Sequence, residues 1–225
     1  MIPGILYIVA TPIGNLEDMT LRAMRILKEV DLIAAEDTRH TRKLLTHFDI
    51  HTPLTSFFQG NEREKAAHIV AQMLTGKNVA LVSDAGTPCI SDPGYPLLIA
   101  AIEAGITVVP IPGPSALAAA LSAAGLPTDR FTFTGFLPDK PGKRKRAIEE
   151  LKDIQHTLVF YVSPWKAAAV VRDCLEVLGD RRACLCRELT KIHEEFRRGT
   201  LAEMAASVEA SPPKGEMTMV VEGKR

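Results

Sequence analysis

The segment VALVSDAGTP, residues 79–88, joins four consecutive apolar residues to a turn of small and polar residues. A short apolar run that ends in such a turn is typical of a strand buried inside a sheet. Comparable runs recur along the chain, at residues 6–10, 32–35, 107–111, 131–135, 157–162, 183–186 and 217–221. We therefore expect strands to be spread over the whole chain.

Helical stretches separate most of these runs. Asp92-Pro93 begins one that Gly105 ends, and Ser163-Pro164 begins another that Gly179 ends. Pro in the first turn and Gly just past the last turn are common helix boundaries. The alternation predicts an α/β fold of two α/β domains with largely parallel or mixed sheets. We expect the boundary near residues 112–114, in a proline-rich stretch, which divides the chain into domains 1–112 and 113–225.

The composition is that of a globular protein. Of the 225 residues, 46% are hydrophobic and 24% are charged, which excludes wholesale disorder. Since 27 basic residues balance 27 acidic ones, any contact with nucleic acid must come from a local basic patch. The four cysteines lack the spacing of a zinc site and predict reduced thiols.

No targeting or membrane segment is evident in the sequence. Residues 1–12 lack the basic start and the cleavage site of a signal peptide. The longest apolar stretch, residues 96–102, is far too short to span a bilayer. We therefore expect a cytoplasmic protein that does not associate with a membrane.

Small or charged residues follow four of the first strands. They read TPIGN at 11–15, EDTR at 36–39, SDAGTP at 83–88 and PIPGPSA at 110–116. In open α/β sheets, ligands bind beyond the carboxyl ends of the strands, so these four segments predict one shared site.

The same segments lack both nucleotide-phosphate motifs, GxGxxG and GxxxxGK[ST]. They offer backbone N–H and C=O groups and few cations, which suits a polar ligand without phosphates. S-adenosylmethionine fits that description, because carbonyls and carboxylates favour its sulfonium cation. Purely structural turns would give similar segments, so this pattern alone leaves both interpretations open.

The segment YIVATPIGNLEDMTLR, residues 7–22, resembles the ribosomal RNA small subunit methyltransferase I family, a branch of the tetrapyrrole (corrin/porphyrin) methylases. The resemblance continues through residues 35–45, 79–97, 110–127, 131–138, 187–199 and 214–223. One segment departs from the family. The family usually has a Glu and a His-Arg pair within residues 160–166, where this chain has Val162 and Trp165-Lys166.

The resemblance implies a homodimer with S-adenosylmethionine in a cleft between two α/β domains. The implied reaction is 2′-O-methylation of a cytidine ribose in the decoding region of small-subunit ribosomal RNA, either free or in the assembled 30S subunit. Domain 1–112 would supply the substrate side and one cofactor wall, and domain 113–225 the cofactor and dimer side.

Cofactor contacts are expected from four groups of residues. They are Pro12 and Gly14; Ser83, Asp84, Ala85, Gly86, Pro88 and Ile90; Ser115 and Ala116; and Phe160 and Met217. The alternatives are a structural turn in which Asp84 caps a helix, a plain helix start at Ser115, and core packing for Phe160 and Met217.

Substrate contacts are expected from residues in the matched motifs and from a basic run at 140–146 on a Pro/Gly loop. They are Asn15, Arg22, Arg39, Arg42, Lys143 and Arg144, and the alternative is a solvated charged face. Arg22 lies on a helix over 18–30 whose buried side is expected to hold Leu21, Met24 and Leu27.

A ribose hydroxyl is a poor nucleophile, and Glu36 and Asp37 are the candidate bases that would activate it. The alternative for Asp37 is a structural pair with Arg39. No metal is expected.

Three rival functions remain at this point. The first is a precorrin or other tetrapyrrole C-methyltransferase of the same fold. The second is a metal-dependent hydrolase that uses Asp37, Asp84 and Asp92. The third is a non-catalytic paralogue that binds the ribosome, which the altered segment 162–166 would suit.

Overall fold

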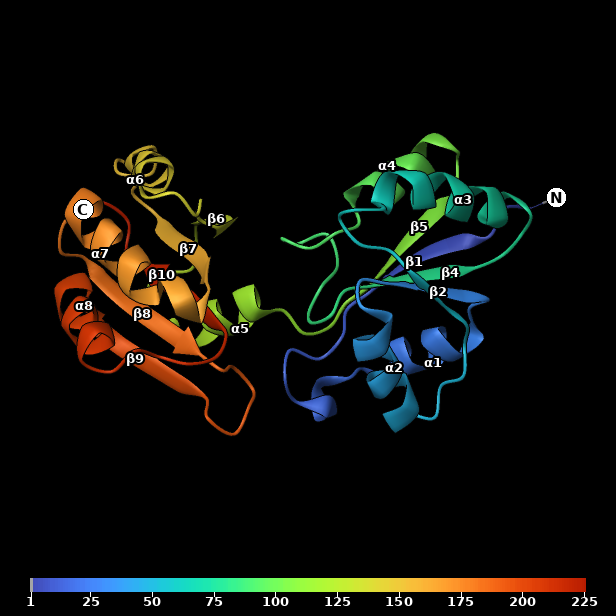
Figure 1. Cartoon of the computed structure of the whole chain (residues 1–225), viewed down its shortest axis with the longest axis horizontal. Coiled ribbons are helices and arrows are strands. Elements are labelled where there is room, and N and C mark those ends of the chain that lie inside the picture. Colours follow the sequence, from blue (N-terminus) through green and yellow to red (C-terminus); the bar gives the residue numbers. More distant parts are fainter. Residues whose placement is uncertain (1) are drawn as a thin grey trace. The chain divides into compact units, whose positions relative to one another are not determined.

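The computed structural model describes residues 2–225. The chain divides into two compact units, Met1–Ser115 and Ala116–Arg225, and each has its own sheet (Figure 1). The α/β fold class that the sequence predicts is confirmed, because both units alternate strands with helices. The roles predicted for the two domains stay predictions.

The first unit has a parallel five-stranded sheet in the order β3-β2-β4-β1-β5. The strands are β1 (Ile5–Val9), β2 (Leu32–Ala35), β3 (Leu54–Ser56), β4 (Val79–Val82) and β5 (Thr107–Ile111). The helices are η1 (Leu16–Asp18), α1 (Leu21–Glu29), α2 (Thr38–His47), α3 (Glu62–Leu74) and α4 (Tyr95–Glu103). Strand β3 was not among the predicted strands, because its three residues are only half buried.

Helices cover both faces of this sheet, with α1 and α2 on one face and α3 and α4 on the other (Figure 1). Along β4, Ala80 and Val82 pack toward α1 and α2, while Val79 and Leu81 pack toward α3 and α4. All four residues of β4 are buried, as expected for a central parallel strand covered on both sides.

The neighbouring strands β1 and β4 send their following helices to opposite faces of the sheet. Helix α1 follows β1 and packs on one face, and α4 follows β4 and packs on the other. This change of side is a topological switch point, the place where open α/β sheets bind ligands. The topology therefore predicts a ligand site at the carboxyl ends of β1 and β4.

The buried side of α1 differs from the expected one. Ala23, Ile26 and Leu27 are buried, whereas Leu21 is 82% exposed. Leu21 is the first residue of the helix, immediately after the N-cap Thr20, so it lies at the edge of the packed stripe rather than over the sheet.

The second unit has a mixed five-stranded sheet in the order β6-β7-β10-β8-β9, with β6 and β7 parallel and the other pairs antiparallel. Its strands are β6 (Phe131–Phe136), β7 (Thr157–Val162), β8 (Arg182–Arg187), β9 (Glu195–Thr200) and β10 (Met217–Val221). Its helices are α5 (Ala116–Ala124), α6 (Pro141–Glu149), η2 (Pro164–Lys166), α7 (Ala167–Leu178) and α8 (Leu201–Ala210).

The basic run 140–146 belongs to a helix and not to the expected loop. Lys140 is the N-cap of α6, and Pro141 occupies the first turn, where its missing N–H costs no hydrogen bond. Gly142 follows within the same turn and does not break the helix.

Phe160 and Met217 lie in the hydrophobic core of the second unit. Phe160 has no exposed surface and Met217 is 4% exposed. This is the core packing considered above as their alternative role, and their contact with the cofactor stays a prediction.

Arg144 is also buried, being 4% exposed, which contradicts its predicted contact with a phosphate. Its Nε lies 2.6 Å from Oδ2 of Asp173, and its Nη1 donates to the backbone oxygen of Asp139 at 3.0 Å. Asp173 is 6% exposed. The guanidinium therefore neutralises a buried carboxylate in the packing of α6 against α7.

Replacement of Arg144 by Ala should destabilise the protein by about 3–5 kcal/mol, because Asp173 would be left as an unpaired buried charge. The double variant Arg144→Met with Asp173→Leu should recover most of that loss. Urea denaturation gives the free energy of unfolding of each variant. Lys152→Ala is the control, since its partner Glu149 is exposed and the pair is worth about 0–1 kcal/mol. A loss for Arg144→Ala as small as that of the control would contradict the structural role.

Candidate functional site

The carboxyl ends of the parallel strands of the first unit lie along one edge of the sheet. The segments that follow β1, β2, β4 and β5 are residues 10–15, 36–37, 83–94 and 112–115. They overlap the four that the sequence singled out, at 11–15, 36–39, 83–88 and 110–116. Hydrogen bonds join these four segments to one another.

Thr11 joins the segment after β1 to the segment after β4. Its backbone N–H donates to the oxygen of Gly86 at 2.9 Å, and the N–H of Gly86 donates back to the oxygen of Thr11 at 3.0 Å. The Thr11 hydroxyl donates to the backbone oxygen of Ser83 at 3.3 Å. This reciprocal pair lies at the switch point and closes the two segments against each other.

The other two segments are fastened to the segment after β4 as well. Oδ1 of Asp84 accepts the backbone N–H of Asp37 at 2.9 Å, which holds the segment after β2. The Thr87 hydroxyl donates to the oxygen of Pro114 at 3.1 Å, which holds the segment after β5. The structure therefore brings all four predicted segments together, with residues 83–87 at their centre.

The backbone of the β4–α4 segment is held in an unusual conformation. Cys89 and Ser91 have φ of 69° and 65°, values that side chains other than Gly rarely adopt. At Gly94, with φ 144°, a Cβ would lie 2.6 Å from Sγ of Cys89 and 2.8 Å from Cδ2 of Leu81. Backbone strain of this kind gathers at ligand sites, where the surrounding structure enforces it.

Cys89 is not a nucleophile in this segment. Burial of the thiol, and then the charges of Asp92 and Glu62, raise its pKa to about 11. The thiol therefore stays protonated at neutral pH, and the reactive form is the thiolate.

The predicted cofactor residues of the first unit differ in how much surface they present. Ala85, Ile90 and Gly14 are exposed, and Asp84 and Ser115 are half-buried. Ser83, Gly86, Pro88 and Pro12 are buried, and the Ser83 hydroxyl donates to the oxygen of Ala85 at 3.4 Å. The buried residues shape the segments, and the exposed ones are the surface available to a ligand. Ala116, at the start of α5, is half-buried. Their contacts with a cofactor stay predictions.

Glu36 is one of the half-buried carboxylates of this edge. Its pKa is raised above the ordinary 4.5, first by burial and then by the charges of Asp84 and Asp92. A carboxylate with a raised pKa is a stronger base than a free one, which suits a group that accepts a proton from substrate.

Asp37 has the opposite environment. Its pKa is lowered to about 2, chiefly by the Arg39 side chain, whose Nη2 lies 2.9 Å from Oδ2. Oδ1 accepts the backbone N–H of Arg39 at 2.8 Å and thereby caps α2. The structural pair considered as the alternative for Asp37 is present, and so weak a base favours Glu36 for proton transfer.

The predicted substrate cations Arg22, Arg39, Arg42 and Lys143 are exposed. Arg39 is engaged by Asp37, while Arg22 and Arg42 lie on α1 and α2. Oδ1 of Asn15 accepts the N–H of Glu17 at 3.0 Å and caps η1. Their contacts with RNA stay predictions.

Thr11 and Thr87 join segments that are far apart in the chain, and sequence reasoning gave neither a role. Thr11 pairs with Gly86 and Thr87 with Pro114. Both lie inside the motifs quoted above, but a Thr in a turn carries no signal of a partner about 27 or more residues away.

Within residues 2–225, no group of three or more His, Cys, Asp and Glu side chains is arranged to hold a metal ion. Over the same residues, no helix is both long and apolar enough to cross a membrane.

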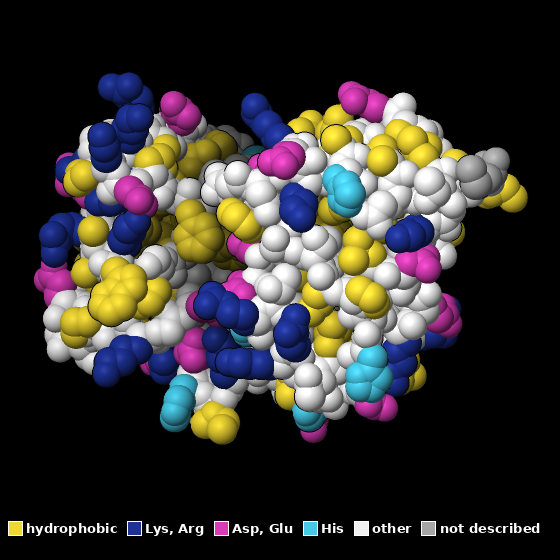
Figure 2. Space-filling model, turned by 45° about the vertical axis from the view of Figure 1, so that its right-hand side comes forward, with side chains coloured by type: hydrophobic (Ala, Val, Ile, Leu, Met, Phe, Trp, Pro, Cys, Tyr) yellow, Lys and Arg dark blue, Asp and Glu magenta, His cyan; other side chains and the backbone are white. Residues whose placement is uncertain are grey.

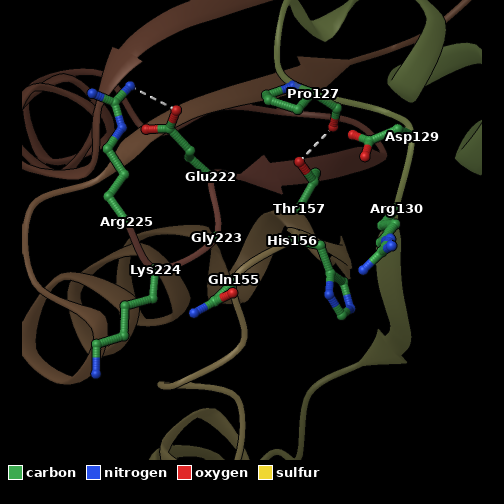
Figure 3. A pocket seen from close by; sticks show the side chains of 10 residues that line it. All are labelled: Pro127, Asp129, Arg130, Gln155, His156, Thr157, Glu222, Gly223, Lys224 and Arg225. Carbon is green, nitrogen blue, oxygen red and sulfur yellow. Dashed lines mark hydrogen bonds and ion pairs between the residues drawn. The ribbon is translucent and has the colours of Figure 1, made fainter.

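A separate pocket of about 700 Å³ lies in the second unit (Figure 3). Residues that precede β6 and β7 line it together with the residues after β10, and Arg225 is paired with Glu222 at 2.8 Å. Nε2 of His156 lies 2.7 Å from the Thr132 hydroxyl. The lining carries both signs of charge and contains none of the predicted site residues.

Comparisons with known proteins agree on a family. The model for tetrapyrrole (corrin/porphyrin) methylases matches residues 5–205. Ribosomal RNA small subunit methyltransferase I of Halalkalibacterium halodurans is 52% identical, over 98% of this chain and 76% of that protein. The protein of the same name from Thermotoga maritima is 47% identical, over 98% and 99%. The one from Escherichia coli O157:H7 is 50% identical, over 99% and 79%.

Solved structures agree on the fold. A uroporphyrin-III C-methyltransferase from Thermus thermophilus superposes with a TM-score of 0.67 at 22% identity, over 97% of this chain and 94% of that one. A second structure of that Thermus thermophilus enzyme gives a TM-score of 0.67 at 17% identity. At this level of identity the likeness concerns the fold alone.

The strained β4–α4 segment predicts a difference between two glycines. Gly94→Ala should lose about 1–2 kcal/mol from its backbone conformation and a further 1–3 kcal/mol from overlap with Cys89 and Leu81. Gly105→Ala, at φ 71° with no atom within 4 Å of the new Cβ, should lose only the first contribution. Urea denaturation measures both, and equal losses would show that the segment has no tight packing at Gly94.

Proposed function

Because this chain belongs to the ribosomal RNA small subunit methyltransferase I family of the tetrapyrrole (corrin/porphyrin) methylases, we propose that it transfers a methyl group from S-adenosylmethionine to small-subunit ribosomal RNA. The finer proposal is that the acceptor is the 2′-hydroxyl of a cytidine in the decoding region. The substrate is the RNA itself or the assembled 30S subunit, and the enzyme works as a cytoplasmic homodimer.

One observation carries the proposal. Relatives that bear this name are 47–52% identical over 98% of the chain, and one of them is covered over 99% of its own length. The resemblance includes the segments at residues 11–15, 36–39, 83–88 and 110–116, which the fold joins at the switch point. The rival tetrapyrrole activity is supported by the match to the broad family model and by solved structures of 17–22% identity.

The residues at this edge fit S-adenosylmethionine chemically. Residues 83–94 and 112–116 contain no Lys or Arg, so nothing in them repels a sulfonium cation or attracts a phosphate. Asp84, Ala85 and Ile90 would hold the cofactor from the β4–α4 segment, with Gly14, Ser115 and Ala116 contributing from theirs. When bound, the cofactor supplies an electrophilic methyl group on a positively charged sulfur.

The residues of this chain then have separate tasks. Glu36, with its raised pKa, would accept the proton that the ribose hydroxyl loses when its oxygen receives the methyl group. Arg22, Arg42 and Lys143 bind phosphates and position the RNA, Arg39 adds charge while it holds Asp37, and Asn15 supplies an amide. Positioning of the hydroxyl against the methyl group is worth about 7–11 kcal/mol in favourable cases.

The test of the proposed function is methyl transfer from radiolabelled S-adenosylmethionine. We expect label in 30S subunits from cells that lack this gene, and mass spectrometry should place it on a cytidine ribose. Uroporphyrinogen III and a precorrin serve as alternative acceptors. Label in a tetrapyrrole but not in RNA would refute the proposal, and label on a base carbon or nitrogen would refute the 2′-hydroxyl.

Glu36→Gln should reduce kcat at saturating cofactor by about 10²–10⁴-fold, the usual range for a general base. In the wild type, kcat should rise with pH through the raised pKa of Glu36, because the base must be ionised, and the variant should lose this rise. Asp37→Asn is the matched control. It should keep the pH profile, because the Asp37 pKa of about 2 lies below the tested range.

Glu36→Gln should lower activity but raise stability at neutral pH. Since the folded pKa of Glu36 is raised above 4.5, ionisation is disfavoured in the folded state, and its contribution to stability falls as pH rises through that pKa. Glu36→Gln should therefore raise the Tm at pH 7 relative to the wild type, with little difference at pH 4. A variant that is both less stable and less active at pH 7 would point to a structural role.

A further inference from the structure

Trp165 is the single tryptophan of the chain, and its side chain is 93% exposed. Tryptophan is highly buried on average, so an indole held almost wholly in water calls for a physical reason. The ring stands in η2, directly after the buried end of β7, and not in a terminal tail. It is therefore presented by a helical turn next to the buried strand β7 of the second unit.

Other aromatic side chains lie at the same edge. Strands β6 and β7 are parallel neighbours, so the residues that follow them come together at their carboxyl ends. Phe136, at the end of β6, is 60% exposed, and its ring lies 5.5 Å from that of Tyr161 on β7. An ion pair between Lys166 and Asp139 ties η2 to the segment that precedes α6.

Helix α6 begins at this edge and presents cations. Lys140, Lys143 and Arg146 are exposed, and within residues 2–225 none of the three has an ion pair or a hydrogen bond from its side chain. Lys140 is the N-cap of α6, and the spacing of three between Lys143 and Arg146 places these two on one side of the helix, away from the buried Ile148. Figure 2 shows Lys and Arg side chains gathered at the upper left, and Figure 1 draws α6 at the upper left of the second unit.

Most acids near these cations are already neutralised. Asp139 is held by Lys166, which lowers its pKa, and Glu149 is paired with Lys152 at 3.1 Å. Glu150 is the remaining exposed acid of the helix end. The surface therefore keeps an excess of positive charge beside exposed aromatic rings.

We propose that Trp165 and Phe136, together with Lys140, Lys143 and Arg146, form a contact surface for unpaired RNA, here called the aromatic–cation surface. An unstacked base lies on the indole and the cations contact the phosphates on either side of it. Single-stranded nucleic acids are bound in this way, by aromatic platforms beside positive charge. The inference rests on the proposed function, since it assumes an RNA substrate.

The fluorescence of Trp165 tests the proposal directly, because the signal has no other tryptophan source. A base stacked on the indole should quench it, so titration with a single-stranded RNA oligonucleotide should give saturable quenching. Polyphosphate of equal charge should not quench, and an RNA duplex of equal length should quench less. Absence of quenching at concentrations where labelled RNA is bound, or equal quenching by polyphosphate, would overturn the proposal.

Variants separate stacking from charge, with binding followed by the anisotropy of a labelled oligonucleotide. Trp165→Leu should weaken binding by about 5- to 100-fold, and Trp165→Phe should retain most of the affinity. Lys143→Ala should make the plot of log K against log salt shallower, with a slope less negative by about 0.7. Arg182→Ala removes an exposed arginine elsewhere in the second unit and should leave both the affinity for the oligonucleotide and the salt slope unchanged. Equal effects of Trp165→Leu and Trp165→Phe, or of Lys143→Ala and Arg182→Ala, would contradict the proposed surface.

Methyl transfer by the wild-type protein separates this inference from the proposed function. If the wild type labels ribosomal RNA but the Trp165 fluorescence never responds to RNA, the aromatic–cation surface is wrong and the function stands. If Trp165 is quenched by single-stranded RNA while no RNA is ever labelled, the surface stands and the proposed function is wrong. Capture of an acidic protein by this surface, with no RNA binding, would refute the inference.

Discussion

The reciprocal backbone pair between Thr11 and Gly86 is the contact on which the candidate site depends. It joins the segments after β1 and β4, the two strands whose helices leave for opposite faces of the sheet. Together with the contact from the Thr11 hydroxyl to the Ser83 oxygen, it holds the turn after β4 against the turn after β1. Because Asp84 and Thr87 then bind the remaining two segments, one pair of hydrogen bonds organises the whole edge.

Two neighbouring carboxylates at this edge are placed in opposite environments. Glu36 is partly buried among acids, which raises its pKa, and Asp37 faces Arg39 and the start of α2, which lowers it. Divergent pKa values of adjacent groups are how proteins assign different roles to chemically similar residues. The residue that supports the helix is thereby separated from the residue available for proton transfer.

The sequence pattern predicted the buried strands and the turns that follow them, because short-range hydrophobicity and turn residues determine both. The buried runs at 79–82 and 157–162 are strands, and the small residues that follow the first four predicted strands do meet at one edge. Strand β9 was missed because its sequence, EFRRGT, is charged and pairs only with β8 at the sheet edge. Arg144 was misassigned because its partner Asp173 lies 29 residues further along the chain. Burial of Phe160 and Met217 likewise depends on long-range packing that residue type does not reveal.

The central claim is that the joined segments of the first unit hold the methyl donor. Amide hydrogen exchange with and without S-adenosylmethionine tests it most directly, because it reports which backbone groups a ligand protects. The account predicts slower exchange in residues 10–15, 83–94 and 112–116 when the cofactor is added. Unchanged exchange in all three, with protection confined to another part of the chain such as the pocket around His156, would contradict it.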